Sequence, residues 1–280
     1  MSKEIENMAR DLAAGGYSPS TQSRYLKEAK VLVERFGREP SELSRDDLRM
    51  FFDESRQAGK TTSWLTNQIC ALRFLYKRTL GRPELVSFLR LPRPYLAVPV
   101  VLSLKEVQAL LNAIRHPRYQ AIAMVMYGSG LRISEALALE TNDIDGERGV
   151  IRVRHGKGNK AREAKLSPDL YLWLRDYWTR CQPAPPHLFA SSTGKLPTTR
   201  TIRKALTAAA QAAWIKKKVT PHVLRHSFAT HLLEQGVDVH VVGVLLGHAS
   251  LTSTVRYARV TRKIVRQTPS PLDLLPQRRL

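Results

Sequence analysis

The pattern of hydrophobic and polar positions predicts that the first third of the chain is helical. Three segments place apolar side chains at helical spacing, and they comprise residues 18–37, 44–59 and 61–81. Residues 1–13 predict a further short helix. Ser18 and Ser44 are N-cap residues for the first two segments, and a glycine follows each of these helices. The four segments together predict a helical bundle.

A proline-rich stretch separates this bundle from a second pattern. The sequence "LPRPYLAVPVVL" contains three prolines, which disfavour regular structure, and we take residues 96–102 as an interdomain linker. Ser103 and Glu106 then predict a capping box at the start of an apolar helix. Further on, "GVIRVRH" and "AREAKL" alternate as strands do, and "GKGNK" between them predicts the turn of a β-hairpin.

Helical patterns dominate the remainder of the chain. "SPD" at residues 167–169 begins one helix, residues 199–213 and 221–235 predict two more, and two short helices follow up to Arg259. We therefore predict a mainly α fold with a small β-sheet or hairpin. Its expected domains are residues 1–95 and 103–265, followed by a tail over residues 266–280. We expect this tail to be loose, with Leu272, Leu274 and Leu275 as its apolar positions.

The charge balance narrows the class of partner. The chain has 280 residues, and 45 Lys and Arg against 24 Asp and Glu give a formal net charge of +21. An excess of this size indicates a polyanion partner, usually nucleic acid. No apolar run approaches the roughly 20 residues that a membrane-spanning helix needs. The start "MSKEIENMARDL" lacks an apolar signal-peptide core, so we expect a cytoplasmic protein without a membrane partner.

Four places along the second domain carry candidate chemistry. Arg132 follows two glycines in "GSGLRISEALAL", and Lys157 lies in the predicted hairpin turn. His222 and Arg225 lie three residues apart in "VTPHVLRHSFATH", which places them near one helix face. The fourth place is "LLGHASLTSTVRY", where His248 stands nine residues before Tyr257. Taken singly, each has an ordinary interpretation as a surface charge, a solvated lysine or a packed aromatic ring.

Metal binding is the weaker interpretation of the histidines. His222 and His226 lie four residues apart, as a metal-binding pair would. A third ligand at a recognisable spacing and the general-base glutamate of the HExxH motif are both missing from the sequence. Cys70 and Cys181 are far apart and lack the spacing of a zinc site. We therefore expect neither a metal nor another cofactor.

Taken together, the four places suit phosphoryl transfer. The transition state of attack on a phosphodiester spreads negative charge over the nonbridging oxygens, and two guanidinium groups such as Arg132 and Arg225 can bind these oxygens bidentately. Lys157 can protonate a departing sugar oxygen, and His222 can exchange a proton near neutral pH. Tyr257 would then be the nucleophile, made more acidic by the nearby cations.

These motifs resemble the catalytic region of the tyrosine recombinase (phage-integrase) family. The order is "GLRISE", "GKGNK", "TPHVLRH", "LLGH" and a tyrosine nine residues after that histidine, which is most similar to the bacterial Xer-type recombinases. The resemblance covers residues 100–262 by motif and residues 1–95 by architecture. It implies a helical core-binding (SAM-like) domain and a mixed α/β catalytic domain, which together clamp double-stranded DNA.

The resemblance also implies a role for each motif residue. Arg132 and Arg225 would bind the scissile phosphate, and Lys157 would be the general acid. His222 would handle a proton, His248 would donate a hydrogen bond in the transition state, and Tyr257 would be the nucleophile. Glu135 would hold Arg132 in position without itself contacting the phosphate. His226 and His231 match no such role, and we expect them to be structural or, for His226, a contact to the DNA backbone.

The implied activity is site-specific recombination through a 3′-phosphotyrosine and a Holliday junction. It implies a homotetramer on DNA in the cytoplasm, associated with the nucleoid, with a second recombinase or a DNA-bending protein as candidate helpers. The ending "SPLDLL" is similar to recombinases of mobile elements, and in the family this segment commonly docks on a neighbouring protomer. Two alternatives stay open, namely a type IB topoisomerase-like DNA relaxase and a DNA-binding protein without catalysis.

Overall fold

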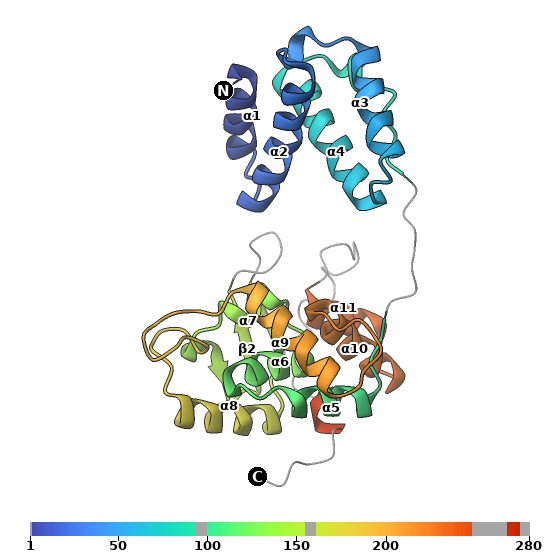
Figure 1. The fold of residues 1–280 in the computed structure, drawn as a ribbon. Coiled ribbons are helices and arrows are strands. Elements are labelled where there is room, and N and C mark those ends of the chain that lie inside the picture. The colour runs from blue at the N-terminus through green and yellow to red at the C-terminus, as the bar shows by residue number, and fades with distance from the viewer. Residues whose placement is uncertain (1, 93–99, 155–160, 248–267, 275–280) are drawn as a thin grey trace. The chain divides into compact units, whose positions relative to one another are not determined.

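The computed structural model describes residues 2–92, 100–154, 161–247 and 268–274. The chain divides into two compact units, Met1–Ala97 and Val98–Leu280, which are described separately (Figure 1). The described residues are mostly helical with one small sheet, so the predicted fold class is confirmed. The predicted hairpin turn and the last predicted short helix lie outside the described residues.

The first unit is a helical bundle, and the two helices with predicted caps begin at them. Its four α-helices are α1 (Lys3–Ala14), α2 (Pro19–Phe36), α3 (Arg45–Gln57) and α4 (Thr62–Phe74), and a π-helical turn (Leu75–Thr79) continues α4. The hydroxyl of Ser18 accepts the N–H of Thr21, and Ser44 and Asp47 form a capping box. Short 3₁₀ helices at Pro40–Glu42 and Pro83–Val86 connect and close the bundle.

The core of the first unit is apolar and closed by a buried tyrosine. It includes Met8, Leu12, Leu32, Leu48, Ile69 and Leu72, each fully buried. The Tyr76 hydroxyl donates a 2.8 Å hydrogen bond to the carbonyl of Pro40, so its polar end is satisfied inside the core. The helical spacing of the apolar positions thus accounts for the packing of this unit.

The second unit surrounds a buried central helix. Its first helices are α5 (Leu104–Ala113), α6 (Pro117–Gly128) and α7 (Ile133–Leu137), and the Ser103–Glu106 capping box starts α5 as predicted. After the sheet come α8 (Pro168–Cys181), α9 (Thr199–Ala212), α10 (Pro221–Glu234) and α11 (Val239–Leu246). Residues 120–128 of α6 are all buried, and this helix packs against α8 and α10.

A three-stranded antiparallel sheet lies in the second unit. It has the order β1 (Ile144–Asp145), β2 (Val150–Val153) and β3 (Arg162–Lys165). Strands β2 and β3 are the predicted hairpin, with Val150 opposite Lys165 and Val153 opposite Arg162. The alternation did not predict β1, because two residues are too few to show a period of two.

The expectation of a loose C-terminal tail is wrong for the residues that the structure describes. A 3₁₀ helix (Pro271–Leu274) contacts α6, α8 and α10, and Leu272 is part of the core. The Ser270 hydroxyl donates a 2.7 Å hydrogen bond to the carbonyl of Gly128 at the end of α6. The apolar leucine was identified correctly, but its partner lies within the same chain.

No helix among the described residues is long and apolar enough to cross a membrane.

Candidate functional site

Helix α10 carries the motif His222–Arg225 in its first two turns. Thr220 caps the helix, and Pro221 occupies the first helical position, where a missing N–H costs nothing. Leu224 and Phe228 are fully buried and hold the helix in the core. His222 is exposed, whereas Arg225 is only 7% exposed. The two motif residues therefore lie on one side of the helix at different depths.

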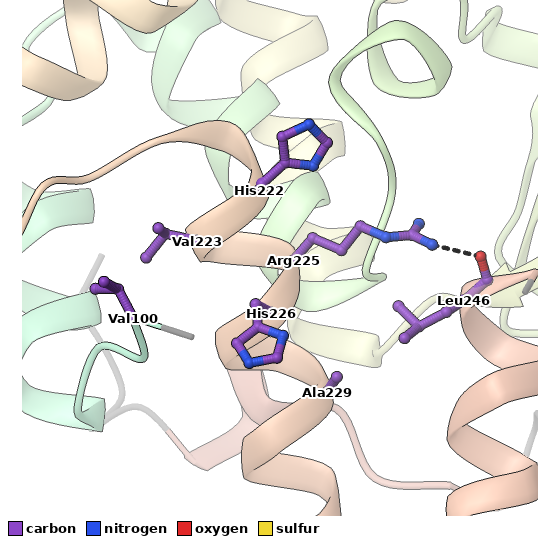
Figure 2. A pocket seen from close by; sticks show the side chains of 7 residues that line it. All are labelled: Val100, His222, Val223, Arg225, His226, Ala229 and Leu246. Carbon is purple, nitrogen blue, oxygen red and sulfur yellow. Dashed lines mark hydrogen bonds between the residues drawn. The ribbon is translucent and has the colours of Figure 1, made fainter. Parts of the chain in front are cut away.

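Arg225 is held by two main-chain carbonyl groups. Its Nη1 donates to the carbonyl of Gly130 and its Nη2 to that of Leu246, both at 2.6 Å, and Figure 2 shows the second bond. Burial, and then the charges of Arg132 and Arg162, lower the pKa of Arg225 to about 10, although the nearby Glu135 opposes this. Arg225 is therefore still a cation at neutral pH, with a fixed orientation.

A glycine turn brings Arg132 close to Arg225. Gly130 has φ +63°, and a Cβ at this position would lie 2.6 Å from ring carbons of Phe228. Both the backbone conformation and the close approach thus require glycine. The turn places Arg132 at the N-cap of α7, where its backbone N–H donates to Oε2 of Glu135 at 2.8 Å.

Three arginines converge on the carboxylate of Glu135. Oε1 accepts from Nη1 of Arg132 at 2.6 Å, and Oε2 accepts from Nη2 of Arg162 at 2.8 Å. Nη1 of Arg225 lies 3.7 Å from Oε2. We call Arg132, Arg162, Arg225 and Glu135 the arginine cluster. Three guanidinium groups against one carboxylate leave an excess of two positive charges, which suits the binding of an anion.

The sequence did not single out Arg162. It stands in an alternating strand, where an arginine is normally a surface charge. Its side chain is only 11% exposed, and burial lowers its pKa while Glu135 opposes this. The one signal in the sequence was its place two residues after the predicted hairpin turn.

A pocket of about 330 Å³ opens beside Arg225. It is lined by Val100, His222, Val223, Arg225, His226, Ala229 and Leu246 (Figure 2). His222 and His226 are one helical turn apart, and His226 is half-buried. Within the described ranges, no group of three or more His, Cys, Asp or Glu residues is arranged to hold a metal ion. The two imidazoles and the guanidinium can bind an anion and exchange a proton.

His231 has the predicted structural role. It is buried, its Nε2 donates to the carbonyl of Leu102 and its Nδ1 accepts from the Tyr127 hydroxyl, both at 2.9 Å. Both ring nitrogens are therefore used in joining α10 to α6 and to the start of the second unit.

Lys157, His248 and Tyr257 lie outside the described residues. The ends of the chain segments that carry the first two are nevertheless defined. Arg162, which follows the Lys157 segment, belongs to the arginine cluster, and Gly247 immediately precedes His248. Gly247 has φ +63°, and a Cβ there would lie 2.5 Å from Nε of Arg162. Both segments thus join the described chain beside the cluster.

Two family models match the chain. The model of the phage integrase family matches residues 101–263, and the model of the phage integrase N-terminal SAM-like domain matches residues 5–84.

Individual proteins match over nearly the whole chain. A putative integrase/recombinase, y4qK, of Sinorhizobium fredii is 38% identical over 97% of this chain and 89% of its own. Tyrosine recombinase XerA of Pyrococcus furiosus is 35% identical over 98% of this chain and 95% of its own. The Tn1549 transposon integrase, solved in complex with transposon right end DNA, has a TM-score of 0.70. It covers 92% of this chain and 95% of its own at 18% identity, and so it supports the fold alone.

Proposed function

This chain belongs to the phage integrase family of tyrosine recombinases, and we propose that it cuts and rejoins duplex DNA at a specific site through a 3′-phosphotyrosine intermediate. Its relatives confirm the predicted recombinase activity and do not favour the topoisomerase-like or binding-only alternatives.

The arginine cluster is the observation that carries the proposal. Arg132 and Arg225 are fixed by Glu135 and by main-chain carbonyls, and Arg225 shares a pocket with the exposed His222. Guanidinium groups that are fixed before substrate binds can stabilise the nonbridging oxygens of a phosphate without rearrangement as charge develops there. The cluster would therefore hold the scissile phosphate.

The proposed reaction balances within the chain and the DNA. The phenolic oxygen of Tyr257 attacks the phosphorus, a 3′-phosphotyrosine bond forms, and the bond to the 5′ oxygen breaks. His222 accepts the phenolic proton of Tyr257, Lys157 gives a proton to the departing 5′ oxygen, and His248 donates a hydrogen bond to the phosphate. The covalent bond conserves the energy of the phosphodiester, so religation needs no ATP. The arginines supply the positive charge that a metal would otherwise bring.

We propose that residues 1–95 and 103–265 are the two DNA-binding domains, joined by residues 96–102 and followed by a tail over residues 266–280. A formal net charge of +21 supports duplex DNA as the partner. A homotetramer that exchanges strands through a Holliday junction, with or without a helper protein, completes the proposal. Such a role would place the protein with the nucleoid in the cytoplasm.

Covalent capture on nicked DNA tests the proposal. Duplexes from the flanking region of the gene would carry a nick near each candidate cleavage position, so that cleavage releases a short fragment and traps the intermediate. The reaction would run in EDTA beside the Tyr257→Phe variant and be resolved on a denaturing gel. We expect a slow-migrating, protease-sensitive band in the wild type alone.

The other outcomes are equally specific. A band that persists in Tyr257→Phe would mean that another residue is the nucleophile. A protein that binds the duplexes but yields no band with any of them would contradict the proposed cleavage. A band that disappears in EDTA would show that the reaction depends on a metal.

A further inference from the structure

Arg162 has a set of contacts that the proposed function does not use. Its Nη2 is bound to Glu135, while its Nε and Nη1 are buried and have no hydrogen-bond partner among the described residues. A buried donor without a partner is unfavourable, because it loses its hydrogen bonds to water on folding. The fold thus retains at this position an arginine that lowers its stability.

The buried atoms of Arg162 separate it from the other two arginines. Arg132 is 22% exposed at its side chain and can meet a ligand from solvent, whereas Nε and Nη1 of Arg162 are shielded on all sides. The only hydrogen bond that the described residues give the side chain of Arg162 is to the carboxylate that also orients Arg132. The contacts of the Arg162 side chain therefore favour a role in holding Glu135 over direct binding of a phosphate.

Arg162 also contacts the end of α11. The backbone of Gly247 lies so close that a Cβ there would come within 2.5 Å of Nε and 2.6 Å of Cδ of Arg162. The neighbouring carbonyl of Leu246 accepts from Arg225. One side chain from the hairpin thus touches the carboxylate that orients Arg132 and the turn that holds Arg225.

We propose that Arg162 is a positioning residue for strand cleavage, which fixes the hairpin, Glu135 and the Gly247 turn relative to one another. This inference rests on the proposed function. The hairpin leads to Lys157 and the turn leads to His248, so a shift of either support by about 1 Å would misplace a group that acts on the phosphate. Misplacements of this size cost about 10²-fold in rate.

The first test compares Arg162→Ala with Arg152→Ala on the nicked duplex that traps the wild type. Arg152 lies on β2 of the same sheet, and its side chain is 50% exposed and paired with Asp145. We expect the rate of covalent complex formation at saturating protein to fall about 10- to 100-fold in Arg162→Ala and to be unchanged in Arg152→Ala. Arg162→Lys, which keeps the charge, should recover part of the rate.

The affinity for DNA provides a readout that separates positioning from phosphate binding. A lost phosphate contact reduces the slope of log K against log salt by about 0.9. We expect Arg162→Ala to keep the wild-type slope. A slope reduced by about this amount would show that Arg162 binds DNA directly and would overturn the positioning role.

A pair of glycine substitutions tests the contact without removing a charge. Gly247→Ala would push a methyl group into Arg162, whereas Gly236→Ala has a similar positive φ of +81° and open space around it. Both variants carry backbone strain from a positive φ, but only Gly247→Ala meets Arg162, so we expect slow cleavage in Gly247→Ala only.

Equal rates in this pair, or in Arg162→Ala and Arg152→Ala, would overturn the inference. Failure of the wild type to form the covalent complex would instead contradict the proposed function, and the two failures are thus distinguishable. Circular dichroism at the assay temperature establishes that each variant is folded.

Discussion

Glu28 in the first unit and Glu135 in the second are both buried, but their carboxylates have different surroundings. Glu28 is 7% exposed, its Oε2 has no hydrogen-bond partner within the described part of the chain, and burial raises its pKa. Lys27 and Lys60 offset this rise only in part. Glu135 is 5% exposed and binds the guanidinium groups of Arg132 and Arg162.

The difference in surroundings reflects different roles of the two buried carboxylates. An isolated buried carboxylate is easily neutralised, and a bundle with an apolar core tolerates it as a modest loss of stability. Glu135 is instead the counterion that allows three arginines to lie close together. Removal of Glu135 would leave the positive charges of the three arginines uncompensated. A bound anion would instead neutralise the positive charge that Glu135 leaves in excess. The second unit thus holds a site with an excess of positive charge, as the proposed binding of a phosphate requires.

The largest effect is expected when the positive site itself is disrupted. Arg225→Ala removes a charge and both carbonyl contacts, so covalent complex formation should slow by about 10²–10³-fold. Arg225→Lys keeps the charge but cannot reach both carbonyls, and we expect an intermediate rate. Single-turnover kinetics on the nicked duplex measure both. A wild-type rate in Arg225→Ala would contradict the proposed role of the arginine cluster in holding the scissile phosphate.

Loss of Glu135, the counterion of the arginine cluster, should lower the free energy of unfolding more than the other substitutions considered. Glu135→Gln leaves the three arginines without a negative partner, and breaking a buried ion pair costs about 3–5 kcal/mol. Sulfate should restore part of this loss, because it replaces the missing negative charge, and it should stabilise the variant more than the wild type. Scanning calorimetry of the full chain with and without sulfate measures this. Equal stabilisation by sulfate in both proteins would contradict the interpretation.

A substitution that distorts the site without changing its charge sharpens the comparison. Gly130→Ala combines a positive φ with a clash against Phe228, so we expect a loss of about 2–3 kcal/mol. Gly59→Ala in the first unit has φ +65° and open space, and backbone strain alone should cost about 1 kcal/mol. Denaturant unfolding gives both values. Sulfate should not preferentially rescue either variant, since neither loses a counterion.

The buried, unpaired carboxylate of Glu28 predicts that the stability of the first unit depends on pH. Because the pKa of Glu28 is raised in the folded state, its contribution is most favourable below its ordinary value of 4.5 and is lost as the pH rises through the folded-state pKa. We expect Glu28→Gln to raise the Tm of the first unit by about 2–4 °C at pH 7 and to have little effect at pH 4. A fall in Tm at pH 7 would mean that the ionised Glu28 is stabilised by a partner.

The smallest effect is expected for an ion pair at the surface. Arg35 binds Glu54 at 2.6 Å and this hydrogen bond lowers the pKa of the Glu54 carboxyl, but both side chains are more than 40% exposed. Exposed pairs are screened by water and salt, so Arg35→Ala should change the Tm by about 2 °C or less. Melting curves at low and high salt measure this. A larger shift would mean that surface charge also stabilises the first unit appreciably.

Local signals in the sequence predicted most of the helices. Ser18, Ser44 and Ser103 cap their helices through short-range bonds to the next turn, and such bonds can be predicted from spacing alone. The same is true of Leu224 and Phe228, whose spacing of four residues predicts one buried helix face. The candidate roles of Arg132, His222 and Arg225 were likewise predicted from the combination of residue types, and they stay predictions.

Contacts between distant segments could not be read in this way. Arg162 and Arg152 lie on neighbouring strands of the same sheet, yet one is buried against Glu135 and the other is exposed. Leu272 was recognised as apolar, but its place depended on a surface formed by α6, α8 and α10. Neither outcome follows from local spacing, because both are decided by residues more than 25 positions away.

The docked segment around Ser270 also has a consequence for the order in which the protein is made. The hydroxyl of Ser270, in the last described segment, binds the carbonyl of Gly128 at the end of α6, so the second unit is complete only when its last residues have been made. The first unit can fold as soon as it leaves the ribosome, whereas the second must wait for about 170 further residues, which at 5–20 residues per second takes roughly 10–35 s. During that interval α6 lacks its final cover, and a chaperone that binds apolar helices would find it exposed.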